Sequence, residues 1–304
     1  MSTHPTILQQ FRSFCFQNNA TNLETAIEYF AVFGGMGWKV DMSVPLDTLI
    51  EEKVLKNYRY IHGDIALITH SNPLHHKILS AIATGDRREH SAFKKSKIER
   101  EHGESSVDFL IDKGLLKEDN SVEKPMKNHE KVSPKLHFIA PFMRFWFSAI
   151  SPYYKGIRDG DYSEFTKYWG NAKHEFANLI YEQLVMALIE KNAIDDPIVL
   201  IGGYWDTETE IDILARSKSG KWIAGACKHS KNKASKSELT KLKESVAKAG
   251  LDVDSYILYS KNKFTTELKK ESGGDLQLYS LGSIGNLLED LSSKDMLVST
   301  NKKY

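Results

Sequence analysis

The chain has 304 residues, of which 41% are hydrophobic and 27% are charged. This is the composition of an ordinary globular protein, and it excludes a wholly disordered, collagenous or coiled-coil chain. The 41 basic and 40 acidic residues leave a net charge of +1, so the total charge favours neither a nucleic acid nor a membrane as partner. No apolar run is long enough to span a membrane, and the first residues lack the pattern of a secretory signal. Two cysteines fit a reducing compartment, and we expect a cytoplasmic protein.

Apolar residues at helical spacing predict an N-terminal helical region over residues 1–70. Ile7, Phe11 and Phe14 begin this pattern, which carries no motif with recognisable chemistry.

The next segment, residues 71–140, has the order of a winged helix-turn-helix. Asn72-Pro73 begins a first helix, residues 91–101 form a second, and Ser105-Ser106 caps a third. Two extended segments follow, joined by a polar stretch whose basic part, residues 124–131, would be the wing. The third helix is rich in carboxylates, which disfavours contacts with base edges and phosphates. DNA binding and a plain packing or dimerisation role are therefore both open for this domain.

Residues 141–170 form an aromatic-rich helical connector. An aromatic run near Arg144 could stack on bases, but Phe142, Phe145 and Trp146 follow helical spacing, which favours a buried core.

Residues 171–304 have the pattern of an α/β domain with a mixed sheet. A helix is expected over 171–192, followed by a buried strand at 198–201. Alternating residues on either side of Gly220 predict an antiparallel hairpin of 209–216 with 221–228. A helix at 237–249 and strands at 256–259 and 276–279 follow, and the helix from residue 171 is expected to cover one face of the sheet.

Asp212 and Lys228 are the residues of this hairpin with the most chemical interest. Both are expected near one edge of the sheet, where the carboxylate could hold Mg²⁺ and the lysine could stabilise charge on a phosphate. The alternatives are a surface salt bridge or two unrelated charges.

The order of these elements is similar to the PD-(D/E)XK, restriction-endonuclease-like fold. The motifs that carry the resemblance are Glu210-Ile-Asp212 and Gly225-Ala-Cys-Lys228. With residues 136–146, Pro152-Tyr153 and Gly202-Gly-Tyr-Trp205, the stretch resembles the uncharacterised C-terminal region of archaeal-type ATPases, domain of unknown function 234. This resemblance covers roughly residues 72–290 and implies a winged helix followed by a nuclease-like domain with Asp212 and Lys228 at its site.

Two departures from the family pattern indicate a degenerate site. The family often has glutamate where this chain has Ala226, and a carboxylate on the preceding helix where the best register places Ala177. Asp212 alone would bind a metal weakly. The glutamates that could replace the missing ligands are Glu175, Glu182 and Glu210. The ATPase module of larger relatives is not found, because no phosphate-binding loop motif is present, so we expect no nucleotide partner.

The segment from Lys228 to Gly250 holds seven lysines against Glu238 and Glu244. Its lysines Lys231, Lys233, Lys236 and Lys241 are candidate contacts for a nucleic-acid backbone, although a solvated helix face would look the same. The first hypothesis is a non-catalytic nucleic-acid-binding or regulatory protein with no cofactor. The alternatives are a Mg²⁺-dependent DNA endonuclease that uses Asp212 and Lys228 with a migrated glutamate, and a protein-interaction or self-association module.

Overall fold

The computed structural model describes residues 4–122 and 132–297, which form two compact units. The first unit contains residues 4–119, 133–177 and 292–297, and the second contains residues 120–122, 132 and 178–291. The predicted basic wing, residues 124–131, lies outside the described residues. Apart from residues 120–122 and 132, the described parts of the expected N-terminal region, winged-helix segment and aromatic connector thus belong to one compact unit.

The N-terminal helices are held by aromatic side chains. Their bounds are α1 Ile7–Gln17, α2 Leu23–Phe33, α3 Leu46–Ile50, a π-helical turn at Glu51–Leu55 and α4 Tyr58–Ile68. Phe30 of α2 is fully buried and lies edge-on to Phe11 of α1, with ring centroids 5.2 Å apart. Trp38 and Tyr58 contact rings of the aromatic segment, at 4.9 Å from Phe142 and 5.6 Å from Trp146. These contacts explain why the two segments pack as one unit.

Three helices and a two-stranded ribbon follow. They are α5 Pro73–Thr84, α6 Glu89–Ser96, α7 Arg100–Asp112, β1 Leu116–Asp119 and the antiparallel β2 Lys135–Phe138. The third helix begins at Arg100, earlier than the predicted cap at Ser105-Ser106. Ser106 instead donates from its hydroxyl to the carbonyl of His102 inside the helix. The element order agrees with the prediction, and its assignment as a winged helix stays a prediction.

The aromatic segment is core, as its spacing indicated. It forms α8 Pro141–Phe145, a π-helical turn at Trp146–Ile150, a 3₁₀ turn at Ser151–Tyr153, α9 Tyr154–Asp159 and α10 Ser163–Phe176. Phe142, Phe145 and Trp146 are at most 1% exposed. Their rings are therefore unavailable for stacking on bases.

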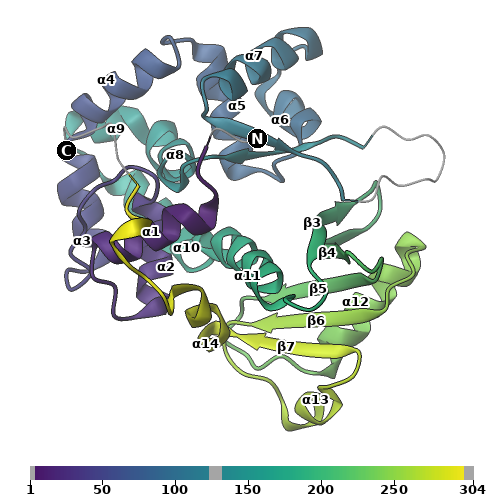
Figure 1. Cartoon of the computed structure of the whole chain (residues 1–304). Helices are drawn as coiled ribbons and strands as arrows, with labels where there is room; N and C mark the ends of the chain where they lie inside the picture. Colours follow the sequence, from purple (N-terminus) through teal and green to yellow (C-terminus); the bar gives the residue numbers. More distant parts are fainter. Residues whose placement is uncertain (1–3, 123–131, 298–304) are drawn as a thin grey trace. The chain divides into compact units, whose positions relative to one another are not determined.

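The second unit is a five-stranded mixed sheet with helices on its faces (Figure 1). The strand order is β3-β4-β5-β6-β7, with bounds Ile198–Trp205, Glu210–Ser217, Trp222–Lys228, Ser255–Ser260 and Leu276–Ser280. The predicted hairpin is confirmed, since β4 pairs antiparallel with β5 and β5 pairs parallel with β6. Its turn contains Gly220 at φ 93°, a conformation that glycine adopts without steric strain.

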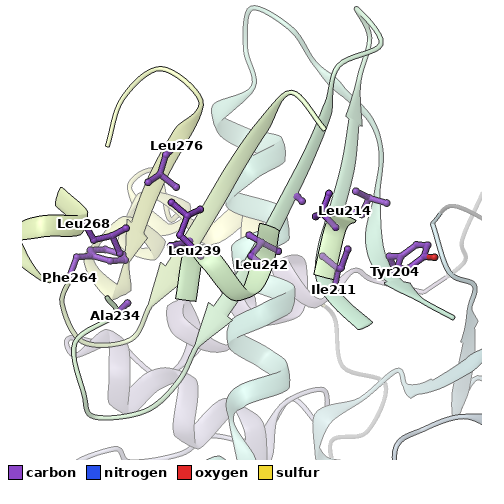
Figure 2. Packing of buried hydrophobic residues seen from close by; sticks show 12 residues of the cluster. Tyr204, Ile211, Leu214, Ala234, Leu239, Leu242, Phe264, Leu268 and Leu276 are labelled. Carbon is purple, nitrogen blue, oxygen red and sulfur yellow. The ribbon is translucent and has the colours of Figure 1, made fainter. Parts of the chain in front are cut away.

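Each face of the sheet has its own helix. The helix α11, Asn178–Asn192, contacts β3 and β4. On the opposite face α12, Lys236–Ala249, and α13, Thr266–Glu271, bury one apolar cluster. In Figure 2, Leu239 and Leu242 of α12 lie between Leu276 of β7 on one side and Leu214 and Ile211 of β4 on the other. The short helix α14, Leu281–Ile284, follows β7.

The predicted helix over residues 171–192 is in fact two helices. α10 ends at Phe176 in the first unit, and α11 begins at Asn178 in the second. Ala177 between them keeps a near-helical backbone, at φ −80° and ψ −6°, which explains why the sequence shows no glycine or proline at the break. Across residues 4–122 and 132–297, no helix is both long and apolar enough to cross a membrane.

Candidate functional site

The two faces of β5 carry different chemistry at its carboxyl end. Ala224 and Ala226 pack against the apolar cluster beneath α12, and strand alternation places Lys228 on the same face. Gly225 approaches Ile213 on the other face, where an added Cβ would lie 3.1 Å from the Ile213 Cβ. Cys227 shares that second face by the same alternation.

Asp212 lies where β4 separates from β5. The regular pairing ends at Ile213 opposite Gly225, and β4 also has an irregular register against β3 between Gly202 and Tyr204. The Asp212 carboxylate fills the gap, because its Oδ2 accepts a hydrogen bond of 2.8 Å from the backbone N–H of Cys227. This side chain therefore replaces a backbone acceptor of the ladder.

Asp212 is held among other acidic groups on the α11 side. Burial raises the pKa of Asp212 to about 6, and the nearby charges of Glu182 and Glu210 act in the same direction. Burial, with Asp212 and Glu182 close by, raises the pKa of the Cys227 thiol well above its ordinary value. The thiol stays protonated at neutral pH, so Cys227 is not a nucleophile here.

His229 completes this cluster and was not predicted from the sequence. Its Nε2 lies 3.3 Å from Glu182 Oε1, and its ring centroid lies 6.0 Å from that of Tyr181 and 6.2 Å from that of Tyr259. Its position directly after Lys228, on the face of Cys227, is the signal that would have identified it.

Lys228 has a different partner. Its Nζ lies 2.6 Å from Glu238 Oε1 of α12, and both side chains are less than a third exposed. Asp212 and Lys228, predicted as a pair, thus engage groups on opposite faces of the sheet. The reason is the bulge of β4, which turns Asp212 toward α11 while Lys228 faces α12.

The other predicted metal ligands are dispersed. Glu182 lies near Asp212, Glu210 is exposed at the start of β4, and Glu175 is exposed in the last turn of α10 in the first unit. The position of Ala226 faces the α12 cluster rather than Asp212. Among the described residues, no group of three histidine, cysteine, aspartate or glutamate side chains is arranged to hold a metal ion.

Two loops at the carboxyl ends of β5 and β6 gather lysines. We call residues 229–235 and 261–265 the lysine loops. They are tied together by backbone hydrogen bonds from Lys261 to Lys228, 3.0 Å, and from Ala234 to Lys263, 2.8 Å. Ala234, itself buried, also bonds Thr265. The backbone hydrogen bonds therefore join the two loops into one surface.

The lysine loops add two residues to the predicted set. Lys231, Lys233 and Lys263 are exposed, and none of the three forms an ion pair within the described part of the chain. The ammonium of Lys261 lies 5.3 Å from the centroid of Tyr181. Lys261 and Lys263 were missed because they follow Lys231 and Lys233 by 30 residues in the sequence. The parallel pairing of β5 with β6 brings the two loops together.

The two remaining predicted lysines lie on α12. Lys236 pairs with Glu271 of α13 at 2.6 Å, whereas Lys241 is exposed. Lys236 is therefore partly neutralised, and Lys241 stands farther along the helix.

Comparisons with known proteins agree with the resemblance seen in the sequence. Residues 146–241 match the family model DUF234, described as archaea bacterial proteins of unknown function. This range contains Glu182, Asp212, Lys228 and His229, and it ends before Lys261. No curated protein and no solved structure matches the chain.

Proposed function

We propose that this chain, whose residues 146–241 belong to the DUF234 family, is a nucleic-acid-binding protein built on a degenerate restriction-endonuclease-like fold. The observation that carries the proposal is the joining of the two lysine loops at the carboxyl ends of β5 and β6. Ligands of open α/β sheets commonly bind at this edge.

Charge and exposure support a phosphate backbone as the ligand. Lys231, Lys233 and Lys263 are exposed, and ammonium groups at a surface gain binding free energy by releasing the counterions of a nucleic acid. Such contacts fix position without reading sequence. We therefore expect binding with little sequence preference and a steep dependence on salt.

The arrangement of the nuclease-like residues supports binding without cleavage. Mg²⁺-assisted cleavage needs carboxylates around the metal and a cation near the same phosphate. Lys228 is instead paired with Glu238, and Asp212 accepts from the Cys227 backbone on the other face.

The test is fluorescence anisotropy with a labelled DNA duplex, a labelled single strand and the matching RNA. Affinity should fall steeply between about 50 and 200 mM salt. Lys231→Glu/Lys233→Glu should weaken binding by about tenfold or more. It should also reduce, by about 2, the slope of the logarithm of the binding constant against the logarithm of the salt concentration.

The matched control is Lys218→Glu/Lys221→Glu. It makes the same charge change at the β4–β5 turn, the opposite end of β5, and should leave most of the affinity. Equal losses in both double variants would mean that net charge, not the lysine loops, governs binding. Unchanged affinity in Lys231→Glu/Lys233→Glu would reject the proposal.

A Mg²⁺-dependent endonuclease is the second candidate function. The specific observation in its favour is the raised pKa of Asp212, caused first by burial and then by the charge of Glu182, since a divalent cation would stabilise two such carboxylates. Cleavage of DNA that requires Mg²⁺ or Mn²⁺ and is lost in Asp212→Asn would establish this function instead.

A further inference from the structure

A cavity of about 480 Å³ lies inside the first unit. Its wall is built mainly by α1, the loop after α2, α4 and the turn after α7, and most of its residues are apolar. Small-molecule sites in proteins usually have volumes of about 300–1,000 Å³ and mostly apolar walls with a few polar groups. The size and the lining of this cavity therefore fit a small organic ligand.

Gln10 of α1 presents a buried acceptor to the cavity. Its side-chain nitrogen Nε2 donates to the backbone carbonyls of Pro5, at 3.1 Å, and Ile139, at 2.9 Å. Because carbonyl oxygens only accept, these bonds fix the amide with its oxygen Oε1 turned away from both carbonyls. Gln10 is 6% exposed, and within residues 4–122 and 132–297 no group donates to Oε1.

Gly35, in the loop after α2, leaves this oxygen uncovered. Its φ is 84°, a conformation that glycine adopts without strain. A Cβ at this position would lie 2.9 Å from Gln10 Oε1 and 2.6 Å from the Ala140 Cβ. Gln17 Nε2 holds the same loop by donating to the Gly37 carbonyl at 2.8 Å. The loop is thus fixed in a position that keeps the acceptor open to the cavity.

Ser13, which also lines the cavity, adds a donor beside this acceptor. Its Oγ accepts from the Leu297 N–H at 2.9 Å, and its own hydroxyl proton has no acceptor in the part of the chain that the structure describes. Ser13 is 6% exposed and follows Gln10 by three residues, on the same face of α1. A ligand group that donates and accepts on one edge would satisfy both side chains.

The charges of the wall favour a neutral ligand. Asp64 and Lys113, the charged residues of the lining, have opposite signs. The buried polar side chains of Gln10 and Ser13 are uncharged, and a neutral group suits them best because a buried charge needs a charged partner. The rings of Phe14 and Trp38 in the wall suit an aromatic body.

We propose that this cavity binds a small, neutral aromatic molecule through an amide edge: the N–H of the ligand donates to Gln10 Oε1, and its carbonyl oxygen accepts from the Ser13 hydroxyl. Lactams and heterocycles that carry this edge form one ligand class for the site. The site belongs to the first unit and is independent of the nucleic-acid-binding proposal.

The test is titration of the ¹⁵N-labelled protein with oxindole, a flat lactam with adjacent N–H and C=O groups. A molecule of this size should bind with a Kd of about 1 mM or lower. N-methyloxindole keeps the ring system and the carbonyl but has no N–H, so it should bind about tenfold more weakly. Oxindole without saturable binding, or equal affinities for the two molecules, would overturn the proposal.

Ile68→Trp and Leu67→Trp locate the bound molecule. Ile68 lines the cavity and is 41% exposed, so a tryptophan there can fill the cavity from its rim. Leu67, also in the last turn of α4, is 75% exposed and is not part of the wall, which makes it the matched control. Ile68→Trp should weaken oxindole binding by about tenfold or more, whereas Leu67→Trp should retain it. Equal affinities in the two variants would place oxindole elsewhere and reject the site.

An independent readout needs only the wild-type protein. Nuclear Overhauser effects should connect the oxindole protons to the methyl groups of Ile61, Ile65 and Met143, all in the cavity wall. Effects that connect oxindole only to residues outside the wall would also overturn the proposal, even if Ile68→Trp failed to fold.

Discussion

At the scale of single residues, Asp212 combines burial with like charges. Its pKa of about 6 lies above the value near 3.9 of an unfolded chain. The folded state therefore binds the proton more tightly, so this carboxyl favours folding at acidic pH. That contribution is lost as the pH rises from about 4 to about 6, and above this range the ionised Asp212 destabilises the fold.

Asp212→Asn should consequently stabilise the protein at pH 7.5 by about 1–3 kcal/mol. The asparagine oxygen still accepts from Cys227 N–H, and the difference from wild type should vanish toward pH 4. Urea unfolding across this pH range measures it. Asp196→Asn is a control of opposite sign, because hydrogen bonds from Ser219 lower the pKa of Asp196. A less stable Asp212→Asn at pH 7.5 would mean that Asp212 is held by a cation.

At the scale of elements, the alternation of apolar and polar residues in β4 and β5 predicted the strands but not the direction of the Asp212 side chain. The period of two correctly predicted the hairpin around Gly220. It failed for the site, because Ile211 and Leu214, three residues apart, both enter the α12 cluster and Asp212 between them leaves it. A bulge of this kind has no residue signature in Glu210-Ile-Asp-Ile-Leu.

Contacts between segments far apart in the sequence were also not predictable from it. Lys261 and Lys263 reach the first lysine loop only through the parallel β5–β6 pairing, and local periodicity carries no information about such pairing. The same holds for α10 and α11, which share an apolar pattern across Ala177 although they belong to different units.

The orientation of β5 gives a prediction for Ala226→Glu. The new carboxylate would enter the apolar cluster beneath α12 and should destabilise the protein by about 1–3 kcal/mol at pH 7. Mg²⁺ should not restore the loss. Thermal unfolding with and without Mg²⁺ measures both effects. Ala247→Glu, on the exposed side of α12, should be nearly neutral. Mg²⁺-dependent stabilisation of Ala226→Glu alone would show that the 226 side chain reaches Asp212.

At the scale of the whole molecule, the chain leaves the first unit and returns to it. Residues 292–297 pack with the N-terminal helices, where Arg12 Nε and Nη2 bind the two carboxylate oxygens of Asp295 at 2.6 and 3.0 Å. The Leu297 N–H also donates to Ser13 Oγ at 2.9 Å. The second unit is thus inserted between segments of the first, and each unit has its own buried core.

Separate cores predict separate responses to mutation. Asp295→Ala removes a two-point Arg–carboxylate contact and should destabilise the first unit by about 1–3 kcal/mol. Leu214→Ala, in the cluster beneath α12, should destabilise the second unit by about 2–5 kcal/mol. Differential scanning calorimetry should resolve two transitions, with each variant lowering a different one. A single transition that both variants shift by amounts in proportion to their free energies would instead show that the two units unfold as one cooperative structure.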